Sequence, residues 1–328
     1  MNIQGRKPPL NEGRYIASID LGSHTARFLV CEIYEPPILF RPIARKRYYT
    51  NLAKGFDNEG AGFIDSEYFK KAVSAVEDFY ITAEEYSVEK IVGAATGIFR
   101  RAKNSQDLLN VIKARTGIEI PIVSGEEEAA ITLKGVFHAL KLKGYPDAFF
   151  DLGGSTTEFI FKRGNKIEVI SLPIGAFVLT GMFLKQDPPA EEEIHSIKKY
   201  IDNTLKEKIG AISDKHEDFL LIGSGGTVTS LAAIINNIDK EDVTPDIING
   251  SVINSVKING FYESLKPLSS HERVRIKNID EGRAKVILAG TVAVMSITEF
   301  FKTKNLTVSY SDILEGLILS YLEGEKDE

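Results

Sequence analysis

Two short stretches of this sequence combine an aspartate, a glycine turn and hydroxyl side chains, which are groups that bind phosphate and divalent cations. Residues 15–33 read YIASIDLGSHTARFLVCEI. Apolar residues lead into Asp20 and resume after Arg27, so this pattern predicts a β-hairpin. The turn contains Gly22, Ser23, His24 and Thr25. Its backbone N–H groups and hydroxyls suit phosphate oxygens, and Asp20 at the strand end is a candidate ligand for a divalent cation.

The same pattern recurs in the second half of the chain. Residues 149–161 read FFDLGGSTTEFIF, and aligning Asp20 with Asp151 pairs Gly22 with Gly153. The second turn contains Gly153, Gly154, Ser155 and Thr156. A repeated strand–glycine turn–strand unit predicts two similar half-domains, each with its own phosphate-binding turn. Two unrelated hairpins are the alternative.

A third glycine-rich segment follows an apolar run at residues 219–222 and precedes a predicted helix at 228–236. A strand, a glycine turn and a helix N-terminus together favour anion binding, which makes Gly225 and Gly226 candidate phosphate contacts. Close packing between the helix and the strand would explain these glycines nearly as well.

The remaining pattern alternates strands with helices, which indicates an α/β fold. We expect a helix capped by Asp65 or Ser66, strands at 90–95 and 118–123, a helix opened by Asp187 and helices at 251–265 and 284–302. Another helix starts after Gly125 with three glutamates, which the helix dipole favours whether or not any of them is functional.

The bulk composition excludes several classes of protein. A chain of 328 residues predicts two domains, and its net charge of −6 provides no basic field for nucleic acid or an acidic membrane. The single Cys31 rules out an internal disulfide framework, and the five histidines lack zinc-ligand spacing. No apolar run has membrane-spanning length and the N-terminus has no signal-peptide core, so a cytoplasmic protein is expected.

Seven motifs taken jointly make the sequence similar to the exopolyphosphatase/guanosine-pentaphosphate phosphatase family. They are 20–27, 95–104, 124–129, 151–158, 171–175, 223–227 and 283–290. This family belongs to the larger group that contains actin, sugar kinases and the heat-shock ATPases. The resemblance implies two ribonuclease-H-like domains with the active site in the cleft between them. Domain I would be residues 1–125 completed by a C-terminal helix at 309–328, and domain II would be residues 126–308.

The resemblance also implies an activity. Members remove terminal phosphate from inorganic polyphosphate, or the 5′ γ-phosphate from guanosine pentaphosphate, with Mg²⁺. Glu128 matches the proposed catalytic base, and Asp151 and Glu158 match the acidic residues close to the metal. Arg27 and Arg100 match positions that would contact phosphate. A homodimer follows by analogy only.

Three departures from the family pattern bear on the substrate. Ser155 stands where most relatives have a third glycine, and its β-carbon is expected to restrict the turn. Val178 and Leu314 stand where many relatives carry arginine, which leaves Arg283 and Lys285 as alternative holders of a long substrate. A non-catalytic sensor of polyphosphate or a guanosine alarmone is one other interpretation, and a small-molecule kinase of the same superfamily is another.

Overall fold

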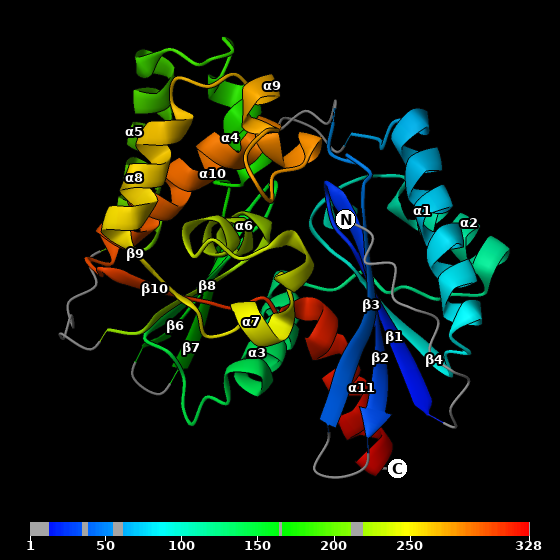
Figure 1. Cartoon of the computed structure of the whole chain (residues 1–328). Coiled ribbons are helices and arrows are strands. Elements are labelled where there is room, and N and C mark those ends of the chain that lie inside the picture. The colour runs from blue at the N-terminus through cyan, green and yellow to red at the C-terminus, as the bar shows by residue number, and fades with distance from the viewer. Residues whose placement is uncertain (1–12, 35–38, 55–61, 164–165, 211–218, 328) are drawn as a thin grey trace. The chain divides into compact units, whose positions relative to one another are not determined.

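The computed structural model describes residues 13–34, 39–54, 62–163, 166–210 and 219–327. The chain divides into two compact units, each of which contains one sheet with helices packed on it (Figure 1). Unit 1 comprises Met1–Gly135 and Asp312–Glu328, and unit 2 comprises Val136–Ser311.

Unit 1 is built on a four-stranded sheet in the order β3-β2-β1-β4. Its strands are β1 (Arg14–Leu21), β2 (Thr25–Tyr34), β3 (Leu39–Tyr49) and β4 (Lys90–Ala95). Its helical elements are α1 (Ser66–Glu85), the 3-10 turn η1 (Gly97–Arg100), α2 (Ser105–Thr116), α11 (Ile313–Asp327) and the first part of α3 (Gly125–Leu140). The pairs β1–β2 and β2–β3 are antiparallel, and β4 is parallel to β1.

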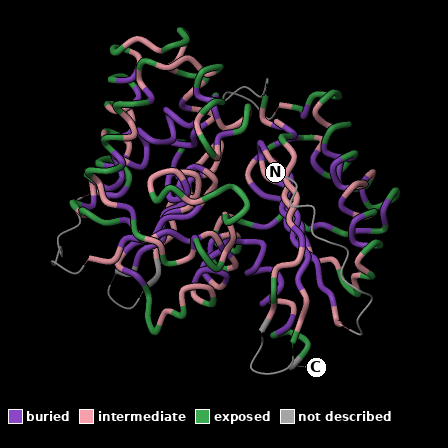
Figure 2. The backbone as a smooth tube through the Cα atoms, viewed as in Figure 1, coloured by how far each residue is buried: buried purple, intermediate pink, exposed green. Residues whose placement is uncertain are grey.

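Alternating side chains of the unit 1 strands serve two separate cores. Ala17, Ile19 and Phe28 belong to the core under α1 and α2, where Phe28 stacks on Phe79 at 5.0 Å between ring centroids. Ile16, Leu29 and Cys31 point to the other face, which packs against apolar residues of α11. This division follows from the two-residue period of a strand. Strand β1 is buried along almost its whole length, whereas the edge strand β3 is mostly half-buried (Figure 2).

Unit 2 has a six-stranded sheet in the order β7-β6-β5-β8-β10-β9. Its strands are β5 (Ala148–Leu152), β6 (Thr157–Arg163), β7 (Lys166–Leu172), β8 (Leu221–Ser224), β9 (Val252–Asn254) and β10 (Asn305–Val308). Its helices are α4 (Ala176–Phe183), α5 (Glu191–Lys208), α6 (Gly226–Ile235), η2 (Lys240–Asp242), α7 (Pro245–Ile248), α8 (Ser255–Leu265), α9 (Ser270–Arg273) and α10 (Glu281–Phe300).

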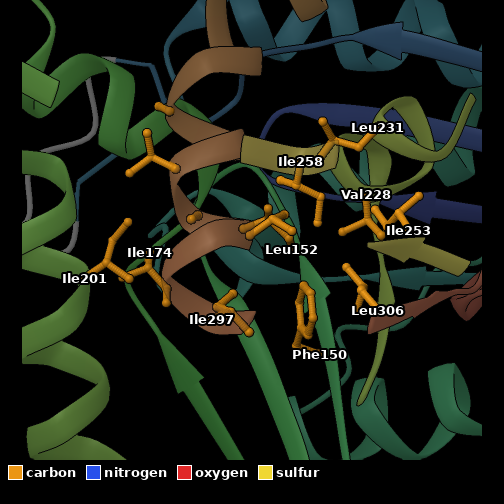
Figure 3. Packing of buried hydrophobic residues seen from close by; sticks show 14 of the residues in the cluster. Phe150, Leu152, Ile174, Ile201, Val228, Leu231, Ile253, Ile258, Ile297 and Leu306 are labelled. Atoms are coloured by element: carbon orange, nitrogen blue, oxygen red, sulfur yellow. The ribbon is translucent and has the colours of Figure 1, made fainter. Parts of the chain in front are cut away.

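Helix α10 is the central helix of the unit 2 core. Its buried face includes Ile297, which lies in the same cluster as Phe150 and Leu152 of β5 and Ile201 of α5 (Figure 3). Twelve residues of α10 are buried, so this helix lies inside the unit rather than on its surface.

The two units repeat one topology. In each, two antiparallel pairs are followed by a strand that is parallel to the first: β1, β2, β3 and β4 in unit 1, and β5, β6, β7 and β8 in unit 2. This is the ribonuclease-H-like order, and it confirms the expected fold class.

The boundaries between the two units differ from the domain boundaries expected after residues 125 and 308. The division falls after Gly135 because the first turns of α3 pack closely on the start of α11. A β-carbon on Gly135 would lie 2.2 Å from the carbonyl oxygen of Asp312. The return of the chain to unit 1 accordingly begins at Asp312.

Three local expectations are wrong. Asp187 does not cap α5, which begins at Glu191; its carboxylate instead accepts hydrogen bonds from the backbone N and Oγ of Ser270, at 2.7 and 2.5 Å. Residues 118–123 form no strand and make one parallel bridge, between Ala95 and Ile122. The segment 251–265 begins with the short strand β9 before α8 starts.

Candidate active site

The first glycine turn joins β1 to β2 and is tightly braced. Gly22 N–H donates to the Thr25 carbonyl at 2.9 Å, and the segment after β3 is held by two backbone bonds, from Asn51 N to His24 O and from Ala53 N to Ser23 O. The Oγ of Ser23 accepts a hydrogen bond from Ile98 N at 3.0 Å. Neighbouring loops therefore hold this turn in one conformation.

The second glycine turn has the same internal geometry. Gly153 N–H donates to the Thr156 carbonyl at 3.0 Å, in the place of the Gly22–Thr25 bond. Asp151 is directly opposite Glu158 across β5–β6, as Asp20 is opposite Arg27 across β1–β2. The predicted repeat is thus confirmed.

The second turn packs on the start of α4. The carbonyl of Gly154 accepts hydrogen bonds from Phe177 N and Val178 N, and a β-carbon on Gly175 would lie within 2.4 Å of Gly154. Ser155 is not among the residues with positive φ, so the turn accommodates its β-carbon without backbone strain.

Arg27 lies between two carboxylates. Its Nε donates to Asp20 Oδ2 at 2.8 Å, and its Nη1 donates to Asp312 at the start of α11. Thr96 Oγ1 donates to Asp20 Oδ1 at 3.3 Å. Burial raises the pKa of Asp20, and the nearby Arg27 guanidinium opposes that shift. The oxygens of Asp20, expected to bind a cation, thus hold a guanidinium and a hydroxyl, so a metal there would compete with Arg27.

The three glutamates that open α3 have different environments. Glu126 is exposed. Glu127 and Ser124 form a capping box at the start of the helix. Ser124 N donates to Glu127 Oε2 at 2.8 Å, which lowers the pKa of Glu127, and Glu127 N donates to Ser124 Oγ at 3.1 Å. Glu128 forms an ion pair with Arg100, with Nη1 2.7 Å from Oε2.

Arg100 links Glu128 to the first sheet. It follows β4 in the η1 turn, and its Nη1 also donates to the carbonyl of Val123 at 3.1 Å. The side chain of Glu128 is 16% exposed and that of Arg100 is 26% exposed. Glu128, the glutamate expected to be the base, is thus partly buried and paired with the guanidinium of Arg100, unlike Glu126 and Glu127.

Asp151 and Glu158 form the acidic pair of unit 2. They are cross-strand partners, so their β-carbons lie about 5 Å apart. Ser224 Oγ donates to Asp151 Oδ1 at 2.7 Å, and Ser171 Oγ donates to Glu158 Oε1 at 2.8 Å. Two adjacent carboxylates held by hydroxyls are hard oxygen donors of the kind that suits Mg²⁺, which usually takes one or two carboxylates and completes its shell with water and phosphate.

The third glycine segment lies against this pair. Gly225 has a φ of +98°, and a β-carbon there would lie 2.3 Å from the Leu152 carbonyl oxygen and 3.0 Å from Asp151 Oδ1. Close backbone approach therefore requires this glycine. Gly226 begins α6, and a β-carbon on it would lie 2.1 Å from the guanidinium of Arg283.

Arg283 is the cation at the start of α6. Its Nη1 donates to Thr227 Oγ1 at 3.3 Å. A positive side chain opposes the positive end of a helix dipole, and a bound anion would reconcile the two. Lys285, the other residue expected to hold a long substrate, is exposed. Asp312 is a further site residue that its local sequence does not indicate, because an aspartate before an apolar helix is typical of an N-cap.

His24 is buried and does not supply a positive charge to the first turn. Burial lowers the pKa of this side chain from the ordinary value of 6.5 to about 4, and a side-chain hydrogen bond to Asn51 opposes the shift. Its imidazole is therefore neutral near pH 7, and any part of His24 in binding phosphate rests on its backbone or on a neutral ring.

This buried histidine predicts acid sensitivity. The unfolded state takes up a proton near pH 6.5 and the folded state only near pH 4, so stability is full above pH 6.5 and falls as the pH drops to about 4. The loss is about 3 kcal/mol. Urea unfolding at several pH values measures the free energy of unfolding as a function of pH. This free energy should fall less steeply with decreasing pH in His24→Gln than in the wild type. The exposed His195→Gln should keep the wild-type slope, and equal slopes in all three proteins would contradict the prediction.

Among the residues that the structure describes, no group of three or more His, Cys, Asp or Glu side chains gathers into a metal site. A Mg²⁺ at Asp151 and Glu158 would therefore depend on water or substrate for its other ligands.

No helix within the described residues is long and apolar enough to cross a membrane.

Two ribonuclease-H-like units with matching glycine turns define a member of the actin-like ATPase fold class. The profile of the Ppx/GppA phosphatase family matches residues 31–325. The chain belongs to this family.

Known proteins are similar over nearly the whole chain. A crystal structure of the Aquifex aeolicus member of the Ppx/GppA family is 30% identical, with a TM-score of 0.78 over 95% of this chain and 99% of that one. Exopolyphosphatase 1 of Mycobacterium tuberculosis is 24% identical over 94% of this chain and 88% of its own length. A bifunctional 3-dehydroquinate synthase/phosphatase of Fusobacterium nucleatum is 29% identical over 94% of this chain. This chain spans about half, 47%, of that protein.

Proposed function

We propose that this protein hydrolyses terminal phosphoanhydride bonds with Mg²⁺, releasing orthophosphate from inorganic polyphosphate or from guanosine pentaphosphate. The repeated glycine turn carries the proposal, because each unit presents one turn with an acidic residue beside it. The name of the Mycobacterium tuberculosis relative supports polyphosphate as the substrate.

Each charged group has a proposed part in the reaction. Glu128 accepts the proton of the attacking water, and Arg100 holds that carboxylate in position. The N–H groups of the turns and the guanidinium of Arg283 bind phosphate oxygens, which stabilises the charge that develops on them. Asp151 and Glu158 hold Mg²⁺, which when bound neutralises charge on the phosphate oxygens.

One assay tests the reaction type. We expect orthophosphate release from polyphosphate or guanosine pentaphosphate with magnesium and without any acceptor. ADP formation from ATP that requires an acceptor would instead indicate a kinase. Binding of either substrate without turnover would indicate a sensor. Only the first result supports the proposal.

The two missing arginines predict a preference for short substrates. Leu314, in the first turn of α11, is 2% exposed and lies in a core cluster with residues of β1 and β2, and Val178 lies in the first turn of α4. Neither position supplies a cation to hold a long chain after a cleavage. A charge-assisted contact is worth roughly 1.5–3 kcal/mol, so one lost contact weakens binding of a long chain about 10- to 100-fold.

Gel electrophoresis of partly digested long polyphosphate measures this preference. We expect a ladder that shifts downward, because the protein releases its substrate between cuts. Val178→Arg should lengthen the run of cuts made per encounter. Full-length chains together with free phosphate, and a higher kcat/KM on long chains, would contradict the prediction.

A further inference from the structure

Strand β3 lies at one edge of the unit 1 sheet (Figure 1). Its Arg47 lies near the first glycine turn, because Tyr49, two residues further on, is directly opposite Thr25. Arg47 is directly opposite Arg27, which is directly opposite Asp20. The three side chains thus form one row across β1, β2 and β3. Adjacent strands lie about 4.8 Å apart, so Arg47 extends this row by one strand beyond Arg27.

The register shows which face of the sheet carries Arg47. Lys46 and Tyr48 bond to Asp78 of α1 on one face. Arg45 pairs with Glu315 of α11 on the opposite face, and Arg47 shares that face because alternate residues of a strand point the same way. The face carries Asp20 and Arg27 as well, so Arg47 lies on the same side of the sheet as the residues beside the turn.

The face opens toward the turn. The side chain of Arg45, under α11, is 14% exposed, whereas Tyr49 at the end of β3 is 36% exposed. Tyr49 is directly opposite Thr25, the last residue of the glycine turn. The backbone bonds from Asn51 and Ala53 to this turn fix the end of β3 beside it.

Arg47 stacks on Tyr49. Its guanidinium carbon lies 5.1 Å from the centre of the Tyr49 ring. Stacking on an aromatic face orients a guanidinium while its N–H donors stay in the plane of the group, where they match phosphate oxygens. Two like charges directly opposite each other would normally be unfavourable, but Asp20 and Asp312 balance the charge of Arg27.

We propose that Arg47, oriented by Tyr49, binds a phosphate of the leaving group, next to the terminal phosphate at the glycine turn. This rests on the proposed function, since it assigns the part of the substrate beyond the cleaved bond. The second phosphate belongs either to an inorganic polyphosphate chain or to a guanosine nucleotide, and both present the same chemistry to a guanidinium.

Steady-state kinetics test this assignment. Arg47→Met should raise KM for tripolyphosphate about 10- to 100-fold and leave kcat within about threefold, because a contact to the leaving group holds substrate and transition state alike. Arg47→Lys should recover part of the loss, and Tyr49→Phe should stay near the wild type. Arg41→Met is the matched control, since Arg41 is exposed on the same strand and pairs with Glu32 at its far end.

Calorimetry gives a second readout that needs no turnover. In the Glu128→Gln background without magnesium, Arg47→Met should weaken the binding of tripolyphosphate and leave the binding of orthophosphate unchanged. Weaker binding of tripolyphosphate identifies an inorganic chain as the source of the second phosphate. Weaker binding of guanosine pentaphosphate alone identifies the nucleotide as its source. No weakening, equal weakening of orthophosphate, or the same effect from Arg41→Met would overturn the inference. A wild-type protein that releases no orthophosphate would overturn the proposed function instead, and the binding comparison would still decide the role of Arg47.

Discussion

Glu128→Gln is expected to lower the rate of orthophosphate release about 10²- to 10⁴-fold, which is the usual contribution of a positioned general base. The amide keeps the size of the side chain and an oxygen that can accept from Arg100, so the fold and the Arg100 contact survive. It cannot take a proton from water. Substrate affinity should change little, because the turns that bind phosphate are untouched.

The neighbouring glutamates provide matched controls on the same helix turn. Glu126→Gln should be near neutral, because that side chain is exposed. Glu127→Gln should slightly lower thermal stability with little loss of rate, because the amide oxygen can still accept from Ser124 N but the negative charge at the helix start is lost. Equal rate losses at all three positions would mean that Glu128 is the wrong choice of base. Single-turnover kinetics separate the chemical step from product release.

The repeated turns could be predicted because they depend on local pattern. An apolar run that ends in Asp, a glycine, hydroxyl residues and a second apolar run specify a hairpin whatever surrounds it. The register of Asp20 with Arg27 and of Asp151 with Glu158 follows once the turn is placed. The choice of Glu128 came from family resemblance, and the structure adds the different environments of its neighbours.

Long-range partners could not be predicted. Asp312 meets Arg27 from almost the other end of the chain, and nothing in either local sequence indicates the contact. The segment 118–123 has the composition of a strand, but it makes one parallel bridge, at Ile122. Asp187 and two following prolines are typical of a helix start, yet its carboxylate bonds to Ser270 on another element. In each case a tertiary contact overrides local preference.

The acidic pair of unit 2 gives the second large effect. Asp151→Asn is expected to raise the Mg²⁺ concentration for half-maximal activity and to lower the rate about 10²- to 10⁴-fold, because a metal contributes several kcal/mol of charge stabilisation in phosphate transfer. The asparagine still presents an oxygen to Ser224 Oγ, so the 2.7 Å hydrogen bond and the approach of Gly225 are preserved. A fall in rate would therefore report the lost negative charge rather than a lost shape.

Magnesium titration of activity and calorimetric Mg²⁺ binding test this role together. Both should show weaker binding in Asp151→Asn, with a rate below the wild type even at saturating magnesium, because a ligand with no charge holds the ion less firmly. Asp246→Asn removes an exposed carboxylate of the same unit and should titrate like the wild type. If Asp151→Asn and Asp246→Asn give the same magnesium curve, Asp151 is not a metal ligand, and its hydrogen bond to Ser224 would be a purely structural contact between β5 and β8.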